Sequence, residues 1–327
     1  MTALMAAMLL SGCGLGAGST PKRIELTVTR DFGARSLSSA AGAAGAAGAA
    51  GGGAAGGGAS AGGGAGSVTH AVGQETVMSL LVRNHSVHTR FGGAFVQSID
   101  GSSGGQQHGE PTDWFYYVNG VEAPKGAADT RVHAGDSVWW DLHNWSQTDD
   151  VPAVVGAFPQ PFLDGIDGKR LPVRVECADV SGAPCKLVTG ELRALGVPAA
   201  IAGVGVTDEP NTLRLVVGAW AQLRHAPSVQ SIQRGPRASG VYARFSADGS
   251  TLIVLDSGGR PTHTLAAGAG LIAATRATHQ GAPVWIVSGT DAAGVQSAAR
   301  AFNRSALHNR FAIALPAGGG ALALPTR

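Results

Sequence analysis

The sequence is poor in charge, in cysteine and in long apolar runs. Of its 327 residues 14% are charged, and 24 Lys and Arg against 22 Asp and Glu leave a net charge of +2. This balance provides neither the basic field that nucleic-acid binding requires nor an acidic tail. No stretch reaches the roughly 20 apolar residues of a membrane-spanning helix. The body of the chain is therefore expected to be soluble, whether tethered or secreted.

The motifs of several large enzyme classes are also missing. The sequence contains no Gly-x-Ser-x-Gly elbow, no His-Glu-x-x-His pair and no phosphate-binding P-loop. Residues 268–273 match a relaxed dinucleotide fingerprint, but they do not follow a strand directly. Its ten histidines are scattered, and Asp141 with His143 is too small a set for a metal. The sequence thus predicts a protein that is not an enzyme, and it identifies no cofactor.

The front of the chain resembles a bacterial lipoprotein signal. A short apolar stretch, residues 3–9, leads into Leu10-Ser11-Gly12-Cys13 and then into the small, flexible residues 14–19. The stretch is too short to span a bilayer and is typical of a signal segment. The resemblance implies a signal at 1–12, lipid on Cys13, a tether at 13–22 and a place on the outer face of the cell membrane. A buried cysteine in an N-terminal core strand is the alternative.

Only two other cysteines exist, Cys177 and Cys185, and they lie eight positions apart around a segment that contains glycine and proline. Such a loop can bring two thiols into bonding range, and an oxidising compartment keeps them joined. We therefore expect a disulfide. Two independent core cysteines are the alternative, whereas a zinc site lacks the second Cys/His pair that four ligands require.

Glycine is abundant in one place. Residues 39–66 consist of 13 Gly, 13 Ala and 2 Ser. This composition cannot bury enough side-chain surface to offset its ordering entropy, so we expect a disordered loop insert without chemistry.

Alternating apolar and polar residues predict several strands around this insert. Strands are expected within 23–37, near 68–72, and at 94–99, 114–118 and 136–143. A helix opens at Gln74-Glu75-Thr76, because Val77, Leu80 and Leu81 then share one face. Asn119-Gly120 is a hairpin turn signal. The order predicts an α+β roll at 23–150, with one helix across a mixed sheet in a β-grasp arrangement.

Four segments of this roll carry a family resemblance. They are Phe95-Val96-Gln97-Ser98-Ile99-Asp100-Gly101, Trp114-Phe115-Tyr116-Tyr117-Val118-Asn119-Gly120-Val121, Gly126-Ala127 and Ala134-Gly135-Asp136-Ser137-Val138-Trp139-Trp140. Together they resemble the transcobalamin-like C-terminal domain family over residues 24–145. The resemblance implies a β-grasp fold on an exported or surface-anchored protein, with cobalamin as a candidate ligand.

Large rings gather at the end of the roll, where Trp114, Trp139, Trp140 and Trp145 lie close in sequence. Strand alternation places Trp114, Tyr116 and Val118 on one face of their strand, and Phe115 and Tyr117 on the other. On the last strand Val138, Trp140 and Leu142 face one way, and Trp139, Asp141 and His143 face the other. One face suffices for the core under a single helix. We expect the second face to contact either a ligand, through Tyr117, Trp139, Asp141, His143 and Asn144, or the following domain.

The second half begins after Pro159-Gln160-Pro161. A linker at 151–170 is expected to lead into a mixed α/β domain at 171–316, followed by a tail at 317–327. Strands are expected at 171–177, 213–217, 241–245, 251–255, 283–288 and 310–315. Helices are expected around Val188 and Leu192, after Trp220, and after Asp291, a natural N-cap.

These features together predict an exported, lipid-anchored, non-catalytic binding protein of the cell surface. Its partners would be the membrane, through lipid on Cys13, and a small ring compound such as a corrinoid or a glycan, but not nucleic acid. Two alternatives stay open: a structural or protein-interaction role in the envelope, and an enzyme whose unfamiliar site lies between the domains.

Overall fold

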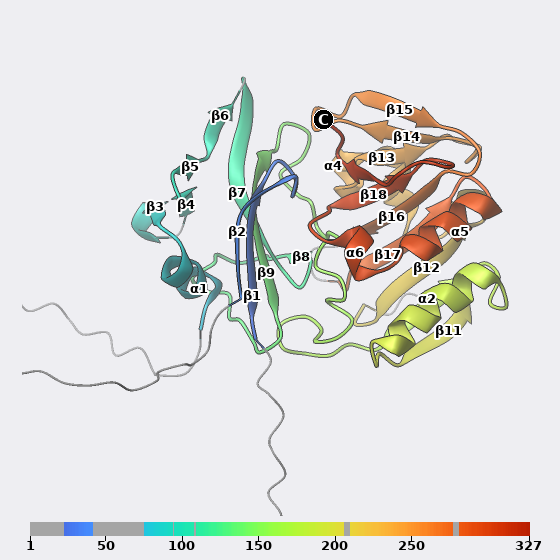
Figure 1. The fold of residues 1–327 in the computed structure, drawn as a ribbon, viewed down its shortest axis with the longest axis horizontal. Helices are drawn as coiled ribbons and strands as arrows, with labels where there is room; N and C mark the ends of the chain where they lie inside the picture. The colour runs from blue at the N-terminus through green and yellow to red at the C-terminus, as the bar shows by residue number, and fades with distance from the viewer. Residues whose placement is uncertain (1–22, 42–74, 94, 108, 206–209, 277–280) are drawn as a thin grey trace, which may run out of the picture.

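The computed structural model describes residues 23–41, 75–93, 95–107, 109–205, 210–276 and 281–327, and these residues form two domains side by side (Figure 1). Both domains combine sheets and helices, so the chain has an α+β fold. Cys13, the strand expected near 68–72 and the Gly/Ala block after Ala41 lie outside the described residues. No helix within the described ranges is long and apolar enough to cross a bilayer.

The N-terminal domain is a roll on a six-stranded sheet. Strand β1 (Glu25–Arg30) forms an antiparallel hairpin with β2 (Arg35–Ala41) and pairs in parallel with β9 (Ser137–Asn144). The other edge of β9 pairs antiparallel with β7 (Glu110–Val118), which also holds β6 (Gly105–Gln107) and β8 (Val121–Glu122). Because β2 runs to Ala41, residues 39–41 of the expected insert belong to a strand.

Helix α1 (Val77–Asn84) covers one face of this sheet. Thr76 caps the helix, since its side chain accepts a hydrogen bond from the Ser79 amide. The expected apolar stripe of Val77, Leu80 and Leu81 is fully buried. The segment after α1 forms a separate small sheet of β3 (Val87–Arg90), β4 (Phe95–Ile99) and β5 (Ser102–Ser103), with the 3-10 turn η1 (Phe91–Gly93) between β3 and β4.

The two faces of the main sheet divide as strand alternation predicts. Six side chains pack in the core under α1: Trp114, Tyr116, Val118, Val138, Trp140 and Leu142. Tyr117 and Trp139 point the other way, into a core that contains residues of both domains. In Figure 1 the sheet of β1, β7 and β9 accordingly stands between α1 and the C-terminal domain.

The C-terminal domain is built on a seven-stranded sheet in the order β11-β10-β12-β17-β16-β18-β19. Its strands are β10 (Val173–Cys177), β11 (Ala199–Gly203), β12 (Leu213–Ala219), β16 (Gly270–Thr275), β17 (Val284–Gly289), β18 (Ala312–Leu315) and β19 (Leu322–Leu324). The first four in spatial order are parallel, and the pairs beyond β17 are antiparallel. Strand β19 lies within the segment expected to be a tail, so this segment provides the edge strand of the sheet.

Different elements cover the two faces of this sheet. Helices α2 (Ala183–Ala194) and α5 (Ala292–Ala301) pack on one face, where Asp291 caps α5 as expected. The other face meets a small antiparallel sheet of β13 (Ala243–Phe245), β14 (Leu252–Leu255) and β15 (Pro261–Leu265). The short helices are α3 (Trp220–Leu223), η2 (Gln230–Arg234), α4 (Pro236–Ser239) and α6 (Arg304–Leu307).

The first part of the expected linker, residues 151–162, is packed in the protein core rather than exposed. All residues in 151–162 are buried. The Val154 amide donates to the Gly120 carbonyl at 2.8 Å, and the Val155 amide donates to the Phe311 carbonyl at 3.1 Å, so this segment bonds to both domains. At Gly156 a Cβ atom would lie 2.6 Å from Trp139 Cζ3 and 2.7 Å from the Arg310 amide, so only glycine fits there.

Candidate functional site

The structure buries most of the residues that the sequence assigned to ligand binding. Tyr117 and Asp141 are fully buried, and Trp139 and His143 are each 2% exposed. Phe311 of the C-terminal domain lies edge-on against Tyr117, Trp139 and His143, with ring centroids 5.1 to 5.5 Å apart. This face therefore packs on the following domain, the second of the two arrangements that the sequence allows.

Asp141 organises the turn between β1 and β2. Its carboxylate accepts hydrogen bonds from the Phe32 amide at 3.0 Å and the Gly33 amide at 2.8 Å, and also from the Thr29 hydroxyl. The Thr29 oxygen in turn accepts from Trp139 Nε1 at 2.7 Å. A buried carboxylate needs such partners to offset its desolvation. Asp141 thus fixes the turn that carries Phe32 into the core between the domains.

His143 lies between two phenyl rings. Its ring centroid is 4.5 Å from that of Phe32 and 4.5 Å from that of Phe115, and its Nδ1 lies 2.9 Å from the Asp141 carboxylate. Asn144 is half-buried at the end of β9, where its side-chain oxygen accepts from the Ser146 amide at 2.7 Å. A ligand could reach the first four predicted residues only if the domains separated, so ligand binding at this set stays a prediction.

The two cysteines of the C-terminal domain are joined. Cys177 at the end of β10 and Cys185 in the first turn of α2 form a disulfide, and both residues are buried. The bond ties the strand to the helix that follows it.

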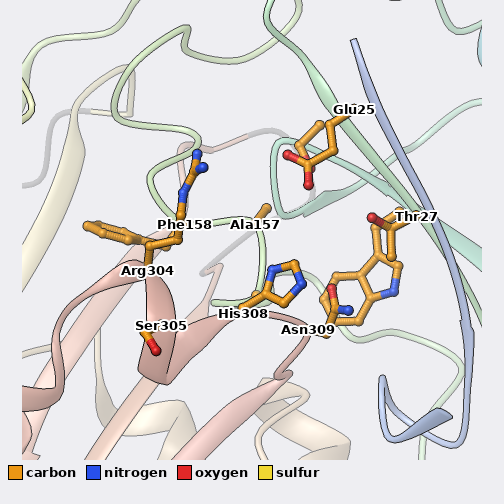
Figure 2. A pocket seen from close by; sticks show the side chains of 11 residues that line it. Glu25, Thr27, Ala157, Phe158, Arg304, Ser305, His308 and Asn309 are labelled. Atoms are coloured by element: carbon orange, nitrogen blue, oxygen red, sulfur yellow. The ribbon is translucent and has the colours of Figure 1, made fainter. Parts of the chain in front are cut away.

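An open hollow, the junction hollow, lies between the domains beside the buried rings. Its volume is about 360 Å³. Its walls consist of Glu25, Thr27, Ser137, Trp139, Gly156, Ala157, Phe158, Arg304, Ser305, His308 and Asn309. Figure 2 shows Glu25 and Thr27 on one side, Arg304 and Ser305 on the opposite side, and His308 between them.

Local structure explains how these side chains come together. Glu25 and Thr27 are two positions apart on β1 and share one face of the sheet. Arg304 opens the short helix α6, whose N-cap Asn303 accepts from the Ala306 amide at 3.0 Å, and His308 follows four positions later on the same side. The buried residues 156–158 complete the lining of the hollow.

The junction hollow offers opposite charges on facing walls. Glu25 presents a carboxylate, and Arg304 a guanidinium that can bind a carboxylate or phosphate in a bidentate manner. Thr27, Ser137 and Asn309 add neutral hydrogen-bonding groups. The sequence did not indicate Glu25, Arg304 or His308, because these residues come from opposite ends of the chain and belong to no local motif.

Two further hollows at the junction of the domains adjoin each other, and Glu122 lines both of them. They have volumes of about 420 and 500 Å³, and Arg276 also lines both. Burial and then the neighbouring Asp150, which shares a side-chain hydrogen bond with Glu122, together raise the pKa of Glu122 to about 9. Glu122 Oε2 has no hydrogen-bond partner among the described residues. This carboxyl group is therefore protonated at neutral pH.

Metal-ligating side chains do not gather in the part of the chain that the structure describes. Within it, no three His, Cys, Asp or Glu residues are arranged to hold a metal ion.

Comparisons with known proteins reach only part of the chain. Residues 74–144 match the model of a domain of unknown function (DUF4430), a range that begins just before α1 and ends with β9. The crystal structure of a proposed metal-binding protein from Ruminococcus gnavus aligns with 38% of this chain and 97% of that one, at 13% identity and a TM-score of 0.23. A likeness this weak says nothing about ligand or mechanism. No curated protein matches the chain.

Proposed function

We propose that this chain is an exported binding protein, held at the outer face of the cell membrane by lipid on Cys13, that binds a small ligand in the junction hollow. The single observation that carries the proposal is the pair of oppositely charged walls, Glu25 and Arg304, at an open hollow between domains. Ligand sites lie preferentially at domain interfaces, and a hollow of about 360 Å³ suits a ligand at the small end of the usual range.

The charges indicate the ligand class. A molecule with an ammonium group and a carboxylate, such as an amino acid or a short peptide, can satisfy Glu25 and Arg304 together. A corrinoid is much larger than the hollow, so it suits this site less well. The transcobalamin-like resemblance, which overlaps the match to a domain of unknown function between residues 74 and 144, implies an extracytoplasmic protein rather than a particular ligand.

Calorimetry tests ligand binding. We expect the full chain to bind glycylglycine saturably, and a ligand at 100 times its Kd should add about 2.7 kcal/mol to the free energy of unfolding. Arg304→Ala should lose binding, whereas Arg300→Ala, an exposed arginine on α5 outside the hollow, should not. If no amino acid or dipeptide binds, or if both variants bind alike, the proposal is wrong.

Lipid labelling tests the anchor. Cells that express the chain are grown with radiolabelled palmitate. The wild type should carry the label, whereas Cys13→Ser should carry no label and should be found in the soluble fraction. Equal labelling of both would contradict the anchor without affecting the ligand proposal.

Glu122 favours a second candidate function, an enzyme with a site between the domains. A carboxyl group whose pKa is displaced to about 9 beside a second carboxyl group, in a hollow, is typical of acid–base sites as well as of buried structural pairs. Hydrolysis of a panel of chromogenic esters and glycosides by the wild type, lost in Glu122→Gln, would support the enzyme. If no substrate is turned over, the binding protein remains the better account.

A further inference from the structure

The sheet of the C-terminal domain reverses its strand order next to β10. From β10 the chain passes through α2 to β11 on one side, and then returns to β12 on the other side of β10. In open α/β sheets, ligands bind outside the carboxyl ends of the strands at such a reversal, because the two connections leave the sheet on opposite faces and open a crevice.

The connections in this domain do diverge. Residues Cys185, Val188 and Leu192 of α2 pack with Val175 and Leu215 on one face of the sheet. Trp220 and Leu223 of α3, which follow β12, pack with Val216 on the opposite face. The carboxyl ends of β10 and β12 therefore lie open between α2 and α3.

A hollow of about 440 Å³, the switch-point hollow, occupies this position. It is lined by Ala178, Asp179, Gly182, Pro184, Cys185, Val217, Gly218, Ala219, Gln222, Ala292, Val295 and Gln296. The disulfide between Cys177 and Cys185 holds the turn that forms one wall, so a covalent bond constrains that wall of the hollow.

The polar groups of the switch-point hollow fit hydroxyl groups. Gln296 is half-buried on α5 and can both donate and accept, while Gln222 accepts from the Ala219 amide at 3.2 Å and keeps its amino group for donation. Asp179 already accepts from the Ser181 amide at 3.0 Å and the Ser181 hydroxyl at 2.8 Å, so part of its hydrogen-bonding capacity is used within its own turn.

The same lining disfavours other ligand classes. A carboxylate at the hollow repels phosphate and other anions. Among the described lining residues there is neither an aromatic ring to stack a flat base nor a basic side chain to hold an acid. The remaining walls are small and largely apolar, and the C–H face of a sugar ring can pack against them.

We propose that the switch-point hollow binds a neutral sugar of one or two rings. Its volume lies in the lower half of the range for ligand sites and gives room for a ligand of that size. The proposal does not depend on the junction hollow, whose residues belong to a different set of elements.

Calorimetry with the full chain tests the site, with glucose, N-acetylglucosamine and trehalose as probes, and ethanolamine and inorganic phosphate as comparators. We expect at least one sugar to bind saturably and neither comparator to compete with it. Gln296→Ala should weaken binding about tenfold, as the loss of one hydrogen bond does. Gln296→Trp, which fills the hollow, should abolish binding.

Two control variants complete the test. Gln233→Ala removes a half-buried glutamine elsewhere in the domain, and Arg304→Ala alters the junction hollow; both should leave sugar binding unchanged. Melting curves show which variants are folded, and Gln296→Ala decides the question if the tryptophan variant is not. The proposal is overturned if no sugar binds, if ethanolamine or phosphate competes, or if Gln296→Ala binds like the wild type.

Discussion

At the scale of single residues, buried polar side chains shape the face of the N-terminal domain that packs on the C-terminal domain. Asp141 and His143 look like a recognition pair in the sequence. In the structure Asp141 bonds to Thr29 and to the turn at Phe32, and His143 contacts the rings of Phe32, Phe115 and, from the C-terminal domain, Phe311. Strand alternation alone divides the aromatic rings of β7 and β9 between the two faces of the sheet. What covers them depends on a C-terminal residue, Phe311, whose position no local pattern predicts.

Asp141→Asn is expected to lower the free energy of unfolding by about 2–4 kcal/mol, because a neutral amide cannot replace the buried carboxylate toward its donors. Urea denaturation of the full chain measures the change. Asp129→Asn, an exposed acid in the same domain, serves as the control and should lose less than about 0.5 kcal/mol. Similar stability of the two variants would show that Asp141 has no structural role.

Glu122 makes stability depend on pH. Its pKa is about 9 in the folded chain against an ordinary 4.5, so the folded state keeps a proton that the unfolded state releases between those values. Stability should therefore be greatest below the lower value and fall as pH rises toward about 9. Glu122→Gln removes this fall. Above pH 9 the free energy of unfolding of this variant should therefore exceed that of the wild type by about 2 kcal/mol or more.

Melting curves from about pH 4 to about pH 10 measure this difference. The half-buried Glu191 on α2 gives a matched control, because Glu191→Gln should follow the wild type across the range. Parallel pH profiles for Glu122→Gln and the wild type would contradict the buried, protonated carboxyl group.

At the scale of secondary-structure elements, the sequence predicts periodic segments well and unpatterned ones badly. The apolar stripe of α1 and the N-cap Asp291 lie where they were expected. Residues 199–203 and 270–275 show no alternation of apolar and polar side chains, so the sequence does not predict the strands β11 and β16. Residues 151–162, expected to belong to a linker, are buried instead. Val151 and Val154 lie in the core that both domains share, whereas Phe158 and Phe162 pack in the core of the C-terminal domain.

The link between β10 and α2 gives an element-scale prediction. Replacing both Cys177 and Cys185 by serine should cost about 2–3 kcal/mol, because the closed loop is short. Tm should fall by about 5–10 °C. A reductant should lower the Tm of the wild type to that of the double variant and leave the variant unchanged. A wild-type Tm that ignores complete reduction would contradict a stabilising disulfide.

At the scale of the whole molecule, the domains share one continuous core. Tyr117 and Trp139 of the roll, Val151 and Val154 of the connecting segment, and Phe311 of the C-terminal domain all belong to it. Because this core fixes the domains against each other, the walls of the junction hollow are held at a set separation. The sequence could not predict that site, since Glu25 and Arg304 meet only when both domains are folded.

Charge selectivity at the junction hollow tests this account most directly. Calorimetry compares glycylglycine with its N-acetyl derivative, which lacks the ammonium group, and with its amide, which lacks the carboxylate. The wild type should prefer glycylglycine over both. Glu25→Gln should erase only the preference over the N-acetyl derivative, and Arg304→Gln only the preference over the amide. Equal affinity of the wild type for all three compounds, or unchanged preferences in the two variants, would contradict it.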